Sequence, residues 1–156
     1  MRPRGFTLIE MLVTTAIVAI LAAIAVPVAQ LTVQRAKEGE LRLALRQLRE
    51  GIDHYKRLVD EGRIARAADG SGYPPSLDSL VQGVPDQRSP DGARIYLLRR
   101  LPRDPFESGR VQNPAESWGL RSYASPPDAP EEGPDVYDVY SRAPGSGLDG
   151  VPYREW

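Results

Sequence analysis

The chain has 156 residues, of which twenty are Lys or Arg and twenty-one are Asp or Glu, so its formal charge at pH 7 is -1. This balance creates no strong field of one sign, and we expect no binding to nucleic acid. The absence of cysteine excludes disulfides, thiolate metal sites and a cysteine nucleophile, while fifteen prolines and fourteen glycines, most of them after Gly62, predict a loop-rich head of one domain.

The N-terminal segment has the composition of a membrane helix. Two arginines, Arg2 and Arg4, precede a mostly apolar run from Phe6 to Leu31. Such a run can cross a bilayer, which takes roughly 20 residues, and the positive charges before it predict a cytoplasmic N-terminus and a head on the outer side. An ordinary signal peptide has a shorter apolar core and a small-residue cleavage site after that core. Here the small residue, Gly5, comes before the run.

The residues Gly5-Phe6-Thr7-Leu8-Ile9-Glu10 resemble the processing motif of type IV prepilins and pseudopilins. The resemblance implies that prepilin peptidase cleaves between Gly5 and Phe6 and that Phe6 is then N-methylated. A carboxylate near the lipid core costs a few kcal/mol unless it is neutralised or paired. For Glu10 the resemblance implies a partner, the α-amine of Phe6 in a neighbouring subunit. The alternative is a glutamate that reaches water at the headgroups.

Pro27 lies inside the predicted helix, where proline removes one backbone hydrogen bond and usually bends the helix. In filaments of the pilin family the helix loses order around a proline at a similar place, so the resemblance implies a role for Pro27 in assembly. A simple kink, or the point where the chain leaves the membrane, remains an equal alternative.

The next segment predicts an amphipathic helix that ends near Glu61. Its apolar residues repeat at intervals of four and three, which places them on one face. The repeat is short, so packing against the chain's own head is favoured over a coiled coil. A helix from Phe6 to Glu61 would be about 80 Å long, and Gly62 would end it in the left-handed conformation. The apolar face comprises Leu41, Leu45, Leu48, Ile52, Tyr55 and Val59.

The head contains signals for short elements separated by loops. Ser76 is placed to cap a short helix in the segment 73–81. The segments 118–123 and 136–141 are rich in β-forming residues and predict strands. Between these strands, the segment 125–134 is a proline-rich, acidic loop.

Several head segments resemble the major pseudopilins of type II secretion. Residues 73–81 are similar to the YP-x-x-L-x-x-L element of that family, and residues 101–106 to its LP-x-DPW motif with Phe in place of Trp. The last segment, 137–156, resembles the family's closing strand and glycine-rich loop. The resemblance implies an α+β fold in which a long N-terminal helix packs on a small antiparallel β-sheet head with a long C-terminal loop. The expected parts are a cleaved leader (1–5), a transmembrane and assembly helix (6–31), an amphipathic stem helix (32–62) and a periplasmic head (63–156).

Major pseudopilins hold calcium in their last loop, and calcium takes roughly six to eight oxygen ligands. Between Ser141 and Trp156 the only side-chain carboxylates are those of Asp149 and Glu155, with the Ser146 hydroxyl as a further oxygen. We favour a turn-forming role for Asp149. A calcium site that uses Asp149 and Ser146 is the alternative.

We therefore expect a non-enzymatic, structural subunit of a type II secretion pseudopilus. The only histidine, His54, lies on the charged helix, where a solvent-exposed side chain is expected, and no phosphate-binding loop or nucleophile motif is present. The resemblance implies storage in the inner membrane and assembly into a periplasmic homo-oligomeric filament that drives export of folded proteins across the outer membrane. The implied partners are prepilin peptidase, an inner-membrane platform protein, an assembly ATPase and minor pseudopilins. The alternatives are a subunit of a surface type IV pilus, for adhesion, motility or DNA uptake, and a single-pass membrane protein that binds a ligand without polymerising.

Overall fold

The computed structural model divides the chain into two compact units, Met1–Lys37 and Glu38–Trp156. The residues whose structure is described are 7–68, 70–107, 109 and 111–156.

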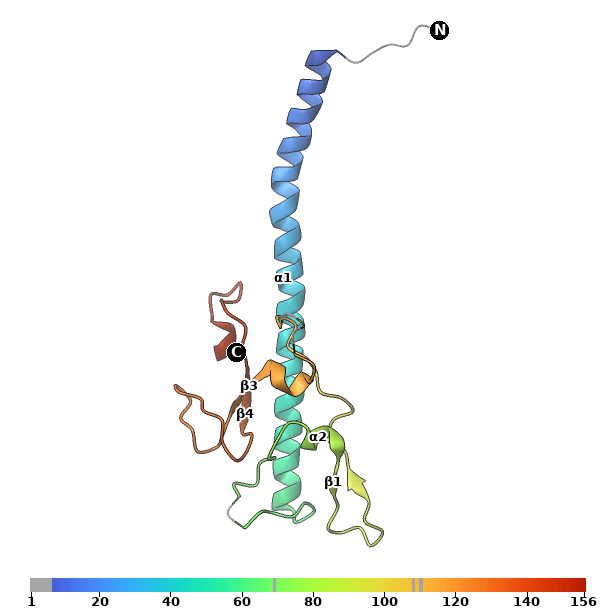
Figure 1. Cartoon of the computed structure of the whole chain (residues 1–156), viewed down its shortest axis with the longest axis vertical. Helices are drawn as coiled ribbons and strands as arrows, with labels where there is room; N and C mark the ends of the chain where they lie inside the picture. The colour runs from blue at the N-terminus through green and yellow to red at the C-terminus, as the bar shows by residue number, and fades with distance from the viewer. Residues whose placement is uncertain (1–6, 69, 108, 110) are drawn as a thin grey trace. The chain divides into compact units, whose positions relative to one another are not determined.

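One helix, α1 (Leu8–Asp60), supplies all of the described regular structure of the first unit and continues into the second. All other elements belong to the second unit (Figure 1). The predicted α+β fold, with a long N-terminal helix and small antiparallel sheets, is confirmed. In chain order these other elements are α2 (Ser79–Gln82), β1 (Val84–Pro85), β2 (Arg94–Ile95), the 3-10 helix η1 (Pro114–Ser117), β3 (Trp118–Arg121), β4 (Asp138–Ser141) and the 3-10 helix η2 (Tyr153–Glu155).

The C-terminal end of α1 is closed by a glycine, as the sequence predicts. Gly62 has a φ of +70°, in the left-handed region that glycine adopts at low cost. Its amide donates to the Val59 carbonyl at 2.9 Å, and the amide of Arg63 donates to the Leu58 carbonyl at 2.8 Å. These two bonds form a Schellman motif, which satisfies carbonyls that the helix end would otherwise leave without partners.

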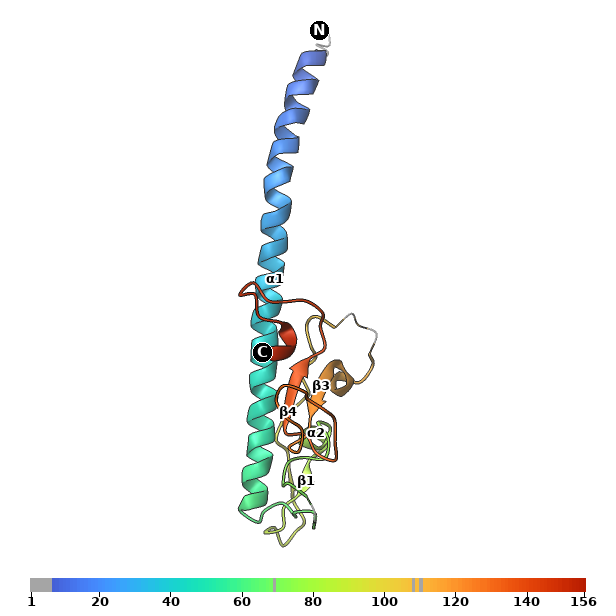
Figure 2. The ribbon, with the colours of Figure 1, turned by 90° about the vertical axis from the view of Figure 1, so that its left-hand side faces the viewer.

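The strands of the head form two separate two-stranded antiparallel sheets, β1 with β2 and β3 with β4. In the second sheet the register runs from Trp118 opposite Ser141 to Arg121 opposite Asp138. Figure 2 shows β3 and β4 side by side. Both predicted strands are present but shorter than expected. The ladder ends after Arg121 because the amide of Ser122 donates to Glu131 in the proline-rich loop, at 2.9 Å.

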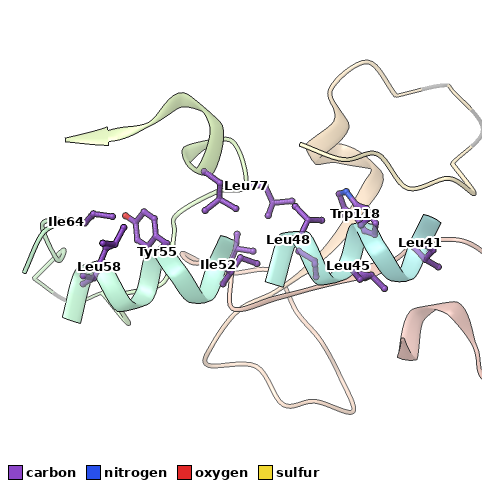
Figure 3. Packing of buried hydrophobic residues seen from close by; sticks show 14 of the residues in the cluster. Leu41, Leu45, Leu48, Ile52, Tyr55, Leu58, Ile64, Leu77 and Trp118 are labelled. Atoms are coloured by element: carbon purple, nitrogen blue, oxygen red, sulfur yellow. The ribbon is translucent and has the colours of Figure 1, made fainter. Parts of the chain in front are cut away.

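The apolar face of α1 forms the core of the second unit, as predicted. All six residues of the predicted face are buried, with exposed fractions between 0% and 7%. Figure 3 shows this face lying against the segments that carry Leu77 and Trp118. Trp118 is fully buried, and its indole Nε1 donates to the Pro102 carbonyl at 3.0 Å. The structure therefore shows that the apolar face of α1 packs against the chain's own head and is not exposed for a coiled coil.

The predicted cap at Ser76 is wrong. The helix α2 begins three residues later, at Ser79, with Asp78 at its N-cap and no side-chain capping bond. The carbonyl of Ser76 instead accepts hydrogen bonds from the amide and the hydroxyl of Ser79, at 3.3 and 2.6 Å. The Leu80 carbonyl then accepts from the amides of Leu97 and Leu98, at 3.1 and 2.9 Å, so this short helix joins the 95–98 segment to the core.

A buried carboxylate fastens the proline-rich loop. Asp135 is 9% exposed. Its Oδ1 accepts from the Ser122 hydroxyl at 2.8 Å and from the Tyr123 amide at 2.9 Å, and its Oδ2 accepts from the Ser71 hydroxyl. Burial raises the pKa of Asp135, but the three hydrogen bonds outweigh this effect, so the pKa lies below its ordinary value.

We expect Asp135→Asn to destabilise the head by about 1–2 kcal/mol at pH 7, because it removes charge-assisted hydrogen bonds from a buried site. The folded-state pKa is lowered, so this contribution is fully present above the unfolded-state pKa of about 3.9 and is lost as the pH falls through the folded-state value. The free energy of unfolding of the full chain in detergent, measured at pH 7 and pH 3, should show a smaller difference between variant and wild type at pH 3. Asp128→Asn, in the exposed part of the same loop, is the control. A difference that does not change with pH would contradict the assignment.

Candidate functional site

The first unit exposes apolar side chains on every side of α1. By length and composition, α1 is the one helix among the described residues that could cross a membrane. Contiguous exposed apolar surface of this kind indicates contact with lipid or with another protein. The large apolar residues exposed here, from 44% for Leu31 to 87% for Leu8, are Leu8, Ile9, Met11, Leu12, Val13, Ile17, Val18, Ile20, Leu21, Ile24, Val26, Val28, Leu31 and Val33.

Glu10 closes the N-terminal end of α1 together with Thr7. The Thr7 hydroxyl accepts a hydrogen bond from the Glu10 amide at 3.3 Å, and the Glu10 Oε2 accepts from the Thr7 amide at 3.1 Å. The same Oε2 accepts from the Thr7 hydroxyl at 3.1 Å. This reciprocal pair is a capping box. The spacing Thr7-x-x-Glu10 is a recognisable signal for it, which our reading of the sequence missed.

The capping box uses one oxygen of the Glu10 carboxylate, Oε2, and leaves Oε1 available for another partner. In the part of the chain that the structure describes, Oε1 accepts no hydrogen bond, and the side chain is exposed. The charge lies in the first turn of α1, where the helix dipole favours an anion. Glu10 can therefore cap its own helix and still accept a cation from outside the chain. Gly5 and Phe6 lie outside the described residues, so the cleavage site and the pairing with a neighbour's Phe6 stay predictions.

Three threonines in the apolar run or directly after it satisfy their own hydroxyl groups. Thr14 donates to the Glu10 carbonyl at 2.9 Å, Thr15 to the Met11 carbonyl at 2.7 Å and Thr32 to the Val28 carbonyl at 3.0 Å. A hydroxyl group that bonds to the preceding turn needs no water. These polar interruptions are therefore compatible with a helix in lipid or in a packed bundle.

Pro27 lies within α1, and the helix continues on both sides of it. A loss of helical order at Pro27 in an assembled filament stays a prediction.

In the second unit the predicted calcium residues make other contacts. Asp149 lies in the predicted turn, where its Oδ1 accepts from the Val151 amide at 3.1 Å and the Gly150 amide donates to the Gly147 carbonyl at 2.9 Å. Its Oδ2 lies 2.8 Å from Nη2 of Arg42. Ser146 forms an isolated β-bridge with Pro152.

As placed, these residues do not fit calcium. Both oxygens of Asp149 have partners, one of them a cation. Within residues 7–68, 70–107, 109 and 111–156, no group of three or more His, Cys, Asp or Glu side chains could hold a metal ion. Calcium binding stays an untested prediction, and the turn-forming role of Asp149 is the one that the geometry supports.

His54, the only histidine, is exposed on α1 as predicted. It supports no catalytic site by itself.

Comparison with known proteins gives a match for the N-terminal segment and matches that extend over most of the chain. The Prokaryotic N-terminal methylation motif matches residues 1–26. Type II secretion system core protein G of Klebsiella pneumoniae is 29% identical over 86% of this chain and 93% of its own length. The protein of that name from Klebsiella michiganensis is 31% identical, over 66% of this chain and 68% of its own length. The one from Dickeya chrysanthemi is 27% identical, over 96% and 95%. No solved structure matches the chain significantly. The family predicted from the head motifs is confirmed: the chain belongs to the type II secretion system core protein G family.

Proposed function

We propose that this chain is the structural subunit of a type II secretion pseudopilus, stored in the inner membrane and assembled through α1 into a periplasmic filament that drives export of folded proteins across the outer membrane. The proposal rests on the sequence and structure of the first unit. There a methylation motif leads into a helix that is apolar on every side and begins with a single exposed carboxylate, that of Glu10.

Such a helix suits two environments in turn. Its exposed apolar side chains are solvated by lipid while the subunit is stored in the bilayer, and packing against the same helices of other subunits replaces the lipid in a filament. Lipid tails and apolar side chains are similar solvents, so packing geometry and polar contacts decide the register of the helices. Glu10 supplies the polar contact: its free Oε1 receives the α-ammonium of Phe6 from a neighbouring subunit.

The topology follows from the basic residues. Arg2 and Arg4 hold the leader in the cytoplasm, so that α1 crosses the inner membrane once and the head folds in the periplasm. Prepilin peptidase then hydrolyses the peptide bond between Gly5 and Phe6 on the cytoplasmic side. The platform protein, the assembly ATPase and minor pseudopilins are the further partners of this assembly. The subunit itself performs no catalysis.

The N-terminus of the mature chain tests this proposal. In cells that contain prepilin peptidase, the membrane form should begin at Phe6 and carry one methyl group on its amine, as read by mass spectrometry of the N-terminal peptide. Gly5→Val should leave nearly all of the chain uncut, because the side chain lies at the bond that is cleaved. A wild-type chain that still begins at Met1 would remove the basis of the proposal.

A further inference from the structure

The terminal loop, residues 145–156, is fastened to α1 by hydrogen bonds and an ion pair. The first of them is Glu38, which is only 6% exposed. Its Oε1 accepts from the Leu148 amide at 2.9 Å and from the Tyr153 hydroxyl at 3.1 Å. A buried carboxylate with such partners positions the loop by hydrogen bonds to two separated points.

Arg42, one turn further along α1, contacts the loop at Asp149 and at its last residue, Trp156. Its Nη2 lies 2.8 Å from the Asp149 Oδ2. Its guanidinium carbon lies 4.2 Å from the centre of the Trp156 ring, which is a cation–π contact. A planar guanidinium combines an ion pair and an aromatic stack in a way that lysine does not.

The loop is shaped for this contact. A Cβ at Gly147 would lie 2.3 Å from the Trp156 ring and 2.7 Å from the Asp149 Oδ1, so only glycine lets the ring and the carboxylate approach the same point. The Trp156 indole Nε1 donates to the Val151 carbonyl at 3.3 Å. Arg49 donates to the main-chain oxygen of Trp156 at 2.6 Å and to the Asp138 Oδ1 of β4 at 2.8 Å.

We propose that the Arg42 guanidinium is the cation that fixes the terminal loop, so that the loop is ordered without a divalent metal. A calcium ion at Asp149 would have to displace a cation already paired there and find roughly six to eight oxygen ligands. The carboxylate nearest in sequence, Glu155, faces Arg154 at 3.8 Å. The proposal does not depend on secretion or filament assembly, and it predicts that the folded head is indifferent to calcium.

Hydrogen exchange of the full chain in detergent micelles tests the proposal, with amide exchange in residues 145–156 measured by mass spectrometry. In the wild type, exchange should be the same in EGTA and in millimolar calcium chloride. Arg42→Ala should raise the exchange rate of this segment roughly fivefold in both solutions, because an exposed ion pair and a cation–π contact are lost together. The exchange rate of Arg42→Lys should lie between those of the wild type and of Arg42→Ala. Arg46→Ala is the control and should have no effect. Arg46 is exposed and lines, together with Arg42 and Trp156, a groove between α1 and the terminal loop. Exchange in β3 and β4 serves as the internal reference.

Two results would overturn the proposal. Wild-type exchange that rises in EGTA and returns with calcium would show that a metal holds the loop. Equal exchange in the Arg42→Ala and Arg46→Ala variants would show that Arg42 does not. The outcome is independent of secretion or filament formation, so it is distinguishable from a failure of the proposed function.

Discussion

Glu10→Leu is expected to leave the chain in the membrane and to abolish filament assembly. Leucine lowers the cost of placing the helix in lipid, so insertion is retained. In a filament, however, the ammonium of the neighbouring Phe6 would be buried without a partner. Breaking a buried pair costs about 3–5 kcal/mol, which weakens each subunit contact by roughly 100-fold or more. Membrane fractionation should show an unchanged amount of inserted protein, and electron microscopy of sheared filaments should show none.

The capping box makes it possible to separate two roles of the same carboxylate. Thr7→Val removes the two hydrogen bonds of the Thr7 hydroxyl with Glu10 and costs about 1 kcal/mol of helix capping. It keeps the main-chain amide of residue 7 as a donor to Glu10 and leaves the charge for a neighbour. Glu10→Gln keeps a side chain that serves in capping boxes and removes the charge. If Glu10 pairs with a neighbour, Thr7→Val assembles and Glu10→Gln does not. Assembly of Glu10→Gln but not of Thr7→Val would mean that Glu10 acts only on its own helix.

The features predicted correctly from the sequence are those with a local or periodic signal. Regular spacing of apolar residues places Leu41 and Leu48 on one face whatever the rest of the chain does, and Gly62 ends a helix through its own conformational freedom. The same reasoning could have found the capping box of Thr7 and Glu10, because that motif is also local.

The features that sequence reasoning missed depend on contacts between distant residues. Glu38 and Tyr153 are 115 positions apart, and Arg42 and Asp149 are 107 apart, so no spacing rule connects them. Asp149 looked like a turn residue or a metal ligand because its arginine partner lies on another element. The predicted cap at Ser76 failed for a similar reason: the hydrogen bonds of Leu80 with Leu97 and Leu98 hold that segment in place, and local preference does not set where α2 begins.

The buried face of α1 gives the largest expected effect on stability. Leu48 is fully buried, so Leu48→Ala should lower the free energy of unfolding of the head by about 2–5 kcal/mol, through lost burial and the cavity that remains. Denaturant unfolding of the full chain in detergent, followed by near-ultraviolet circular dichroism, measures this change. The signal should report loss of packing around Trp118, which belongs to the same core.

Leu43→Ala is the matched control, since it makes the same chemical change in the same helix at a position that is 55% exposed. It should change stability by less than about 0.5 kcal/mol. The comparison also decides whether the apolar face of α1 packs on the chain's own head or forms a coiled coil between subunits. If this face served mainly in a coiled coil between subunits, neither substitution would matter in a monomer in detergent, and equal small effects would contradict the packing seen here. A large effect at Leu48 alone means that this part of α1 belongs to the head before any filament forms, which leaves the exposed helix of the first unit as the part free to assemble.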